Sequence, residues 1–152
     1  MRCRLRGRMM GSFKINGLDS LINDLSALAA LPDSVAEDML NAGADIIEAE
    51  QHKTAKSMGV YDTGVTEGSI KKTKVKKTAT GKSIDIFPQG VNSDGNRNAE
   101  VAFINEFGKS GKHGKKGQPA RPFIRTANEA AEERATEAEE KVYNDFLNGK
   151  NL

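Results

Sequence analysis

The chain has 152 residues, of which 37% are hydrophobic and 29% are charged, and it contains no Trp. This length predicts one domain that is large enough to bury a core. The 23 basic and 21 acidic residues leave a net charge of +2, which does not indicate a nucleic-acid binder. No apolar run approaches the ~20 residues that span a bilayer, and the single cysteine, Cys3, excludes an internal disulfide.

Residues 1–11 are basic and lack the apolar stretch of a secretory signal. Because an ordinary protein start would fall at Met10, we expect the residues before it to be an upstream-start artefact or a disordered arm. The expected organisation is therefore an N-terminal extension over 1–11 and a single domain over 12–152.

Two elements are expected at the start of that domain. Polar and apolar residues alternate over 12–15, which predicts a short strand. Leucine and isoleucine then recur at helical spacing over 18–31, and Pro32 ends that helix.

A long helix is expected over about residues 35–57. Ser34 and Glu37 match a capping box, in which the hydroxyl and the carboxylate satisfy backbone N–H groups reciprocally. Gly59 can end the helix in the left-handed conformation, and a helix of this length is about 35 Å long. The residues expected in its buried stripe share helical spacing and are Val35, Met39, Ala42, Ile46 and Ile47.

Three strands are expected in the middle of the chain. Residues 69–77 are lysine-rich with widely spaced apolar residues, and residues 82–87 and 99–107 alternate apolar and polar side chains. Asp94 and Gly95 are a hairpin signal between the last two strands. These segments predict a small antiparallel sheet.

The C-terminal part is expected to form a loop, a stiff segment and a long helix. Residues 108–118 hold four Gly, four Lys and no apolar residue, so we expect this loop to be mobile. Gln118 and Arg121 each precede a proline and are therefore extended. Pro122 can begin a helix, and apolar residues at helical spacing continue it to about residue 147, with glutamates on the opposite face.

Together these elements predict an α+β fold. A small antiparallel sheet is packed by a long N-terminal helical region and a long C-terminal helix. The fold class by itself indicates no activity, so any function has to come from particular residues.

No catalytic, cofactor-binding or metal-ligating set is expected, and we therefore expect no enzyme. The Gly-Lys-Ser at 81–83 lacks the earlier glycine and the following helix of a phosphate-binding loop. A calcium loop beginning at Asp94 lacks its required glycine and glutamate. His52 and His113 have no partner at metal-ligand spacing, and we expect His52 to be a solvated helix residue.

Lysines cluster in two segments, 71–82 and 109–116. They can provide solubility and protect edge strands, or they can contact phosphate groups transiently. Aromatic residues that would stack on bases do not interleave with them. Both interpretations stay open at this point.

Three stretches carry a family resemblance. YDTGVTEGSI at 61–70 resembles an Asp-Thr-Gly turn motif followed by Ser-Ile, and VAFINEFGKSG at 101–111 resembles a strand that ends in Glu-Phe-Gly before a flexible loop. QPARPFIRTANE at 118–129 resembles a Gln-Pro-Ala-Arg-Pro-Phe-Leu-Arg segment that opens a C-terminal helix. In this order, over about residues 12–147, the chain resembles the neck or tail-completion family of long-tailed bacteriophages, small structural proteins similar to lambda minor tail protein Z.

The resemblance implies a structural role at the head–tail junction of the virion, in tail completion and head–tail joining through ring assembly. It implies a ring-shaped homo-oligomer such as a hexamer, with head-closure and tail-tube or tail-terminator proteins as neighbours. It also implies location in the virion, after assembly in the host cytoplasm, without a membrane partner, and it leaves transient contact with packaged DNA open. The alternative is a small nucleic-acid-binding protein that uses the lysines of 71–82 and 109–116.

Two sets of residues follow from these patterns. Those expected at an assembly interface are charged and surround the loop: Arg121, Arg125, Lys109, Lys112, Lys115, Lys116 and Glu106. Those expected as structural anchors lie in the three motifs: Asp62, Thr63, Gly64, Phe107, Gly108, Pro119, Pro122 and Phe123.

Two contacts are expected within these sets. Phe123 should plug the start of the last helix against the sheet, near Phe103 and Phe107. Arg121 and Arg125 have two candidate ion-pair partners. One is Glu106 of the same chain, and the other is a carboxylate on the acidic helix of a neighbouring subunit.

Overall fold

The computed structural model describes residues 31–60, 65–111 and 116–150. All the described elements belong to one compact unit, Pro32–Leu152.

The strand and the helix expected at the start of the domain cannot be compared with the structure. The strand expected over 12–15 lies outside the described residues, as does the helix expected over 18–31 apart from its last residue. The single domain expected from residue 12 onward therefore stays a prediction.

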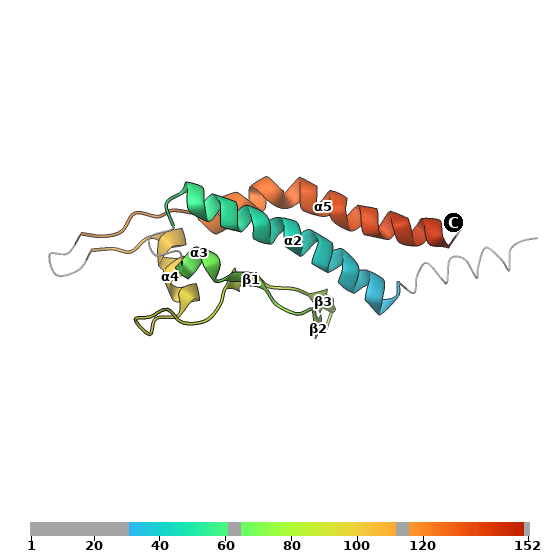
Figure 1. Cartoon of the computed structure of the whole chain (residues 1–152), viewed down its shortest axis with the longest axis horizontal. Helices are drawn as coiled ribbons and strands as arrows, with labels where there is room; N and C mark the ends of the chain where they lie inside the picture. Colours follow the sequence, from blue (N-terminus) through green and yellow to red (C-terminus); the bar gives the residue numbers. More distant parts are fainter. Residues whose placement is uncertain (1–30, 61–64, 112–115, 151–152) are drawn as a thin grey trace, which may run out of the picture. The chain divides into compact units, whose positions relative to one another are not determined.

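Two long helices, α2 (Asp33–Ser57) and α5 (Phe123–Gly149), pack along each other and make the main contact of the unit (Figure 1). Ala127, Ala131 and Ala135 recur at one-turn spacing on the buried face of α5. Small side chains at this spacing allow two helix axes to approach closely. Both predicted long helices are confirmed, and so is the α+β fold class.

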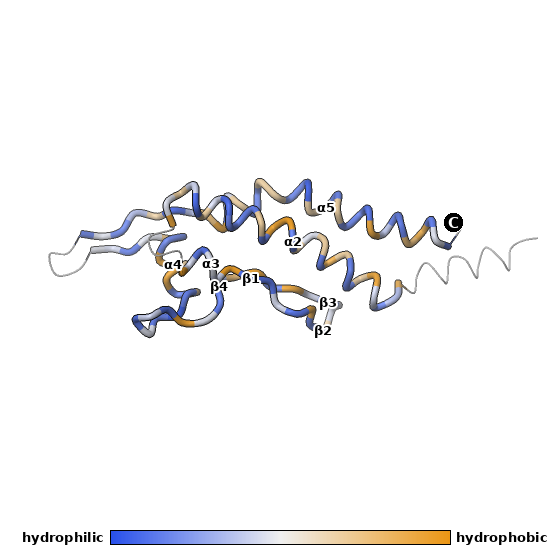
Figure 2. Tube along the Cα trace, viewed as in Figure 1, coloured by the Kyte–Doolittle hydropathy of each residue, from blue (hydrophilic) through white to orange (hydrophobic). Residues whose placement is uncertain are grey.

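The contact between the two helices is narrow and only partly apolar. Figure 2 shows hydrophilic residues over much of α5, with hydrophobic residues recurring between them. The residues expected in the buried stripe of α2 are only half-buried: Val35, Met39, Ala42, Ile46 and Ile47. The fully buried residues of α2 are small or polar instead: Gly43, Ala44, Glu50, Gln51, Thr54 and Ala55. The stripe prediction is wrong because the alanines of α5 meet the small and polar residues of α2.

The start of α2 differs from the expected capping box. The helix begins at Asp33, with Pro32 as its N-cap, and no side chain caps it. Ser34 lies inside the first turn, and the Glu37 carboxylate accepts a hydrogen bond from Lys82 Nζ at 2.7 Å. The capping-box prediction is wrong because a lysine 45 residues away in the sequence binds Glu37.

The end of α2 is as expected. Gly59 has a φ of 69°, and the Val60 N–H donates to the Ala55 carbonyl at 2.9 Å. In this left-handed ending the chain folds back over the last helical turn. It places Val60 among the buried residues.

The strands of the described residues form a two-stranded ribbon: β1 (Ile70–Lys72), β2 (Lys76–Thr78), β3 (Gly81–Ser83) and β4 (Ile86–Pro88). β1 pairs antiparallel with β4, and β2 pairs antiparallel with β3. The two pairs are separate sheets, because residues 73–75 and 84–85 between them belong to neither ladder. This break interrupts both strands that were expected over 69–77 and 82–87.

The third expected strand is a helix. α3 (Val65–Gly68) leads into the ribbon, and α4 (Asn98–Phe107) follows it. The buried residues of α4 have helical spacing and are Asn98, Ala102, Asn105 and Glu106. The strand prediction over 99–107 is wrong because a short apolar stretch can match both a helical and a strand period.

The expected turn at Asp94 and Gly95 does form. Gly95 has a φ of 81°, and Val91 and Arg97 pair across the turn as an isolated antiparallel bridge. The turn leads into α4 rather than into another strand.

Five elements meet in one small core. It consists of Ala55, Val60, Ile70, Ala102 and Phe123, and Met58, Ile86 and Ile124 pack against it. Phe123 is 0% exposed, so its predicted role as a buried plug is confirmed. Phe103 and Phe107, which were expected near it, are 62% and 67% exposed and are not members of this core.

We expect Phe123→Ala to lower the free energy of unfolding by about 3–5 kcal/mol, because it empties the centre of this core. The same truncation of the exposed Phe103 is the matched control and should change stability by about 0.5 kcal/mol or less. Urea denaturation of both variants measures the difference. Equal losses for the two variants would contradict the assignment of the core.

Candidate functional site

The junction between α4 and α5 is organised by a buried carboxylate. Glu106 is 8% exposed, and its two oxygens accept hydrogen bonds from the N–H groups of Ile124 at 2.9 Å and Arg125 at 3.1 Å. These N–H groups at a helix start have no partner within the helix, and the helix dipole favours a negative charge there. Glu106 therefore caps α5.

This contact corrects the expected role of Glu106. Its carboxylate forms no ion pair with Arg121 or Arg125 in the described part of the chain. A carboxylate that is buried and bonded to the backbone of its own chain is poorly placed for an interface. The prediction missed this because the capped helix begins 17 positions further along the sequence.

Gly108 allows the chain to leave α4 beside the segment that enters α5. Its φ is 76°, and a Cβ at this position would lie 2.8 Å from the Gln118 carbonyl oxygen. Lys109 and Gln118 then exchange two backbone hydrogen bonds of 2.9 and 2.8 Å. The side-chain amide of Gln118 also donates to Asn105 Oδ1 at 2.8 Å. The base of the predicted loop over 108–118 is therefore tied to α4.

Part of this loop has no description. Lys112 and Lys115 lie outside the described residues, whereas Lys109 and Lys116 are exposed on either side of them. The predicted mobility of the loop stays a prediction. The anchors expected at Asp62, Thr63 and Gly64 also fall outside the described residues.

Arg121 braces the stiff segment against two other elements. Its backbone N–H donates to the Asn105 carbonyl at 2.6 Å, and its Nη1 donates to the Gly59 carbonyl at 2.8 Å. A guanidinium near the end of α2 also suits the negative end of that helix. Pro122 is the N-cap of α5, and Pro119, near the start of the stiff segment, is exposed. Arg121 thus has a partner within its own chain, whereas Arg125 is exposed.

The lysines of the ribbon are mostly paired with carboxylates of the same chain. Lys72 pairs with Asp45, Lys76 with Asp85, Lys77 with Asp33, and Lys82 with Asp33 and Glu37. Lys71 and Lys74 are exposed. Most of the positive charge in 71–82 is therefore matched locally.

These pairings shift the pKa values of two groups, Asp33 and Lys82. Hydrogen bonds from Lys77 and then from Lys82 lower the pKa of the Asp33 carboxyl. Burial lowers the pKa of Lys82, but its hydrogen bonds to Glu37 and Asp33 outweigh burial and raise the pKa overall. Both shifts favour the charged forms that hold the ribbon to the start of α2.

His52 is not the solvated residue that was expected. Its Nδ1 lies 2.7 Å from Glu67 Oε1, and Lys56 Nζ lies 3.3 Å from the same oxygen. Glu67 is buried, so the group ties α3 to α2. No three His, Cys, Asp or Glu side chains of the described residues come together as a metal-binding group.

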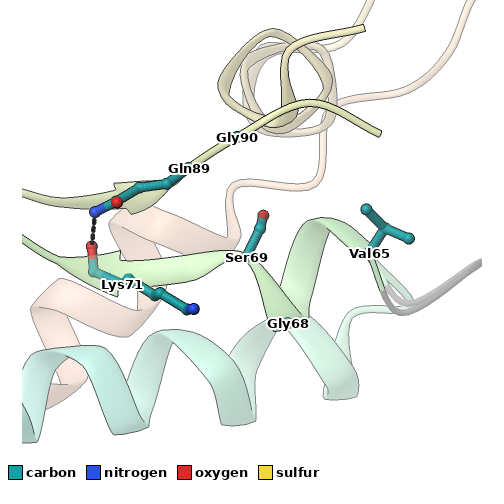
Figure 3. Close-up of a pocket in the computed structure, with 6 residues that line it drawn as sticks. All are labelled: Val65, Gly68, Ser69, Lys71, Gln89 and Gly90. Carbon is teal, nitrogen blue, oxygen red and sulfur yellow. Dashed lines mark hydrogen bonds between the residues drawn. The ribbon is translucent and has the colours of Figure 1, made fainter. Parts of the chain in front are cut away.

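A shallow groove lies between the start of β1 and the segment after β4 (Figure 3). It is lined by Val65, Gly68, Ser69, Lys71, Gln89 and Gly90. Gln89 Nε2 donates to the Lys71 carbonyl at 3.0 Å, and the Ser69 hydroxyl donates to the Thr66 carbonyl at 2.8 Å. This lining offers no carboxylate or histidine that could act as a base for a serine nucleophile.

The described surface carries an exposed aromatic pair. The rings of Phe103 and Phe107, one turn apart on α4, have centroids 4.7 Å apart at an interplanar angle of 45°. Four of the five exposed large hydrophobic residues of the described chain lie between residues 87 and 107: Phe87, Val91, Phe103 and Phe107. The strand prediction missed this pair. A helical interpretation of 98–107 would have indicated it, because residues four apart lie on the same face of a helix.

A second surface is acidic. A shallow groove along α5 is lined by Glu129, Glu132, Glu133, Thr136, Glu137 and Glu140. All six are exposed, and the five glutamates form no ion pair with any described residue. The acidic face expected on the last helix is therefore present.

Comparisons of the chain with protein family models, with curated proteins and with solved structures found no match. Within the described residues, none of the helices combines the length and apolar character that crossing a membrane requires.

We expect Glu106→Ala to lower the free energy of unfolding by about 2 kcal/mol, because two charge-assisted hydrogen bonds at the start of α5 are lost. Glu100→Ala is the matched control, since Glu100 is exposed on the same helix. Chemical denaturation measures both variants. A loss for Glu106→Ala that is no larger than the loss for Glu100→Ala would contradict the cap.

Glu50 gives a prediction about pH. Its Oε2 accepts a hydrogen bond from Arg134 Nη2 at 2.6 Å, and its Oε1 accepts one from Lys53 Nζ at 3.0 Å. These bonds, the one from Arg134 first, lower the pKa of the Glu50 carboxyl below its ordinary value of 4.5. A lowered pKa stabilises the fold above the ordinary value, and this contribution disappears as the pH falls through the folded-state value.

We therefore expect Glu50→Gln to be less stable than the wild type at neutral pH, and the difference to shrink as the pH falls below 4.5. Urea denaturation across this pH range measures it. Glu132→Gln, on the exposed face of α5, is the control and should show little difference at any pH. A difference for Glu50→Gln that stays constant with pH would sink the assignment.

Proposed function

We propose that this chain is a virion structural protein of a long-tailed bacteriophage, located at the head–tail junction. It acts in tail completion and head–tail joining by assembling into a ring. The family resemblance of three ordered stretches, 61–70, 101–111 and 118–129, is the basis of the proposal.

One structural observation supports it most. The second and third of these stretches bind each other. Glu106 accepts hydrogen bonds from the backbone of Ile124 and Arg125, Asn105 binds Gln118 and Arg121, and Phe123 packs in the core with Ala102. Each residue type is required by its contact: a carboxylate to cap α5, a glycine for the left-handed turn and a phenylalanine for the core. A chance match to two motifs would not be expected to join them in one contact.

The proposed partners are copies of the same chain in a ring, together with head-closure and tail-tube or tail-terminator proteins. The exposed aromatic pair supports an assembly role, because exposed apolar patches often mark protein–protein contacts. Among the residues expected at the interface, Arg125, Lys109 and Lys116 are exposed and stay candidates. We expect no catalytic turnover, because the described groove at Lys71 and Ser69 offers no catalytic set.

The alternative function is nucleic-acid binding by the two lysine segments. The pairing of Lys72, Lys76, Lys77 and Lys82 with carboxylates weighs against it, because their charge is largely matched within the chain. Salt-dependent retention of the monomer on DNA would favour this alternative. Ring formation that depends on protein concentration would favour the structural role.

Deletion of the gene from the virus tests the proposal. We expect filled heads and complete tails that fail to join into infectious particles, or joined particles with a defective tail end. Electron microscopy of the lysate shows which of these occurs, and expression of the chain in trans is the control that should restore infectivity. Normal infectivity of the deletion virus would rule the proposal out.

A further inference from the structure

The aromatic pair on α4 is followed in the sequence by a basic segment. Phe103 and Phe107 are exposed, and Lys109 and Lys116 are exposed on the paired segments that follow α4. Between Glu106 and Glu129 the sequence contains six basic residues and no acidic one. An aromatic pair together with cationic residues fits an anionic partner, since the edges of aromatic rings also carry partial positive charge.

The same chain carries a surface of the complementary kind. α5 holds seven acidic and three basic residues. Five exposed glutamates line one groove on its outer face, from Glu129 to Glu140. At 1.5 Å per residue this face is about 16 Å long. We call it the glutamate face.

The two surfaces of one molecule cannot meet. α4 touches only the start of α5, where Glu106 binds Ile124 and Arg125, and α5 then runs along α2 (Figure 1). The α5 helix is continuous from Phe123 to Gly149, so the glutamate face cannot fold back onto Phe103 and Phe107. A glutamate face on these phenylalanines must therefore come from another molecule.

We propose that Phe103 and Phe107, together with Lys109 and Lys116 of the segments that follow α4, dock on the glutamate face of α5 of a second copy of this chain. The inference rests on the proposed function, because it names the contact that would join neighbours in the ring. The contact is heterologous: each copy offers one surface and accepts the other. Such a contact repeats from copy to copy, and it closes into a ring when the rotation between neighbours allows closure.

Two one-sided variants test the contact. One carries Phe103→Ser and Phe107→Ser, and the other carries Glu132→Lys, Glu133→Lys and Glu137→Lys. All five positions are exposed, so both variants should melt as the wild type does. Each variant alone should need a concentration higher by on the order of tenfold to associate, as expected for the loss of a principal contact.

Mixing the two variants gives the decisive measurement. The phenylalanines of the second variant and the glutamates of the first still form one intact contact, so the mixture should give a dimer and no larger species. Sedimentation velocity resolves the sizes. Phe87→Ser and Asp94→Lys are matched controls on exposed residues outside both surfaces and should assemble as the wild type does.

A charge exchange provides a second test. Lys109→Glu with Lys116→Glu should weaken association, and the three glutamate reversals in the same chain should restore it. Restored association cannot arise from a folding defect, because it requires both changed surfaces at once. Failure of the exchange to restore any association, together with no dimer in the mixture, would overturn the inference.

Other occupants give different results. If the phenylalanine variant loses retention on single-stranded DNA and associates normally, the aromatic pair stacks on bases and the inference is wrong. If that variant melts early as a monomer, the pair is covered by its own chain and the inference is also wrong. If the wild type assembles and the one-sided variants assemble equally well, the inferred contact is wrong and the proposed function is unaffected. If the wild type never assembles and the deletion virus is infectious, both the inferred contact and the proposed function are wrong.

Discussion

The Glu106 carboxylate accepts two backbone hydrogen bonds at the start of α5, and this contact determines where the longest helix begins. Burying a carboxylate is costly unless it is hydrogen-bonded, so the position of α4 relative to α5 is narrowly defined. Once α5 begins there, Phe123 enters the core and Arg121 reaches the carbonyl of Gly59. The alanines further along α5 then lie against α2. A contact at one end thus orients a helix of 27 residues.

The core of the described unit is small, and polar contacts provide much of the remaining connection between its helices and strands. α2 is connected to α5 by Glu50 and Arg134, to α3 by His52 and Glu67, and to the ribbon by Glu37 and Lys82. Exposed ion pairs usually contribute little to stability, but Glu50, Glu67 and Lys82 each have a largely buried side chain. This arrangement leaves larger apolar groups such as Phe103 and Phe107 on the surface, available for contacts between molecules.

The sequence predicted what local signals determine. Gly59 ends α2 because glycine tolerates the left-handed conformation, and Pro122 precedes α5 because proline fixes its own φ. Residues 98–107 were predicted wrongly, since ten residues are too few to separate the two periods. The cap by Glu106, the pairing of Glu37 with Lys82 and the contact of His52 with Glu67 join residues distant in sequence. No local pattern could indicate them, because they depend on how the elements pack.

The break in pairing between the two strand pairs has a consequence for local unfolding. It separates a base, where Ile70 and Pro88 are buried, from a tip, where every residue of β2 is exposed. The tip is attached to α2 by the ion pairs of Lys77 and Lys82, which dissolved salt screens. The base also has an ion pair to α2, from Lys72 to Asp45, but it is attached in addition by apolar burial, which salt does not screen. The ribbon therefore consists of two segments of unequal local stability, and the tip can open and close while the base stays paired.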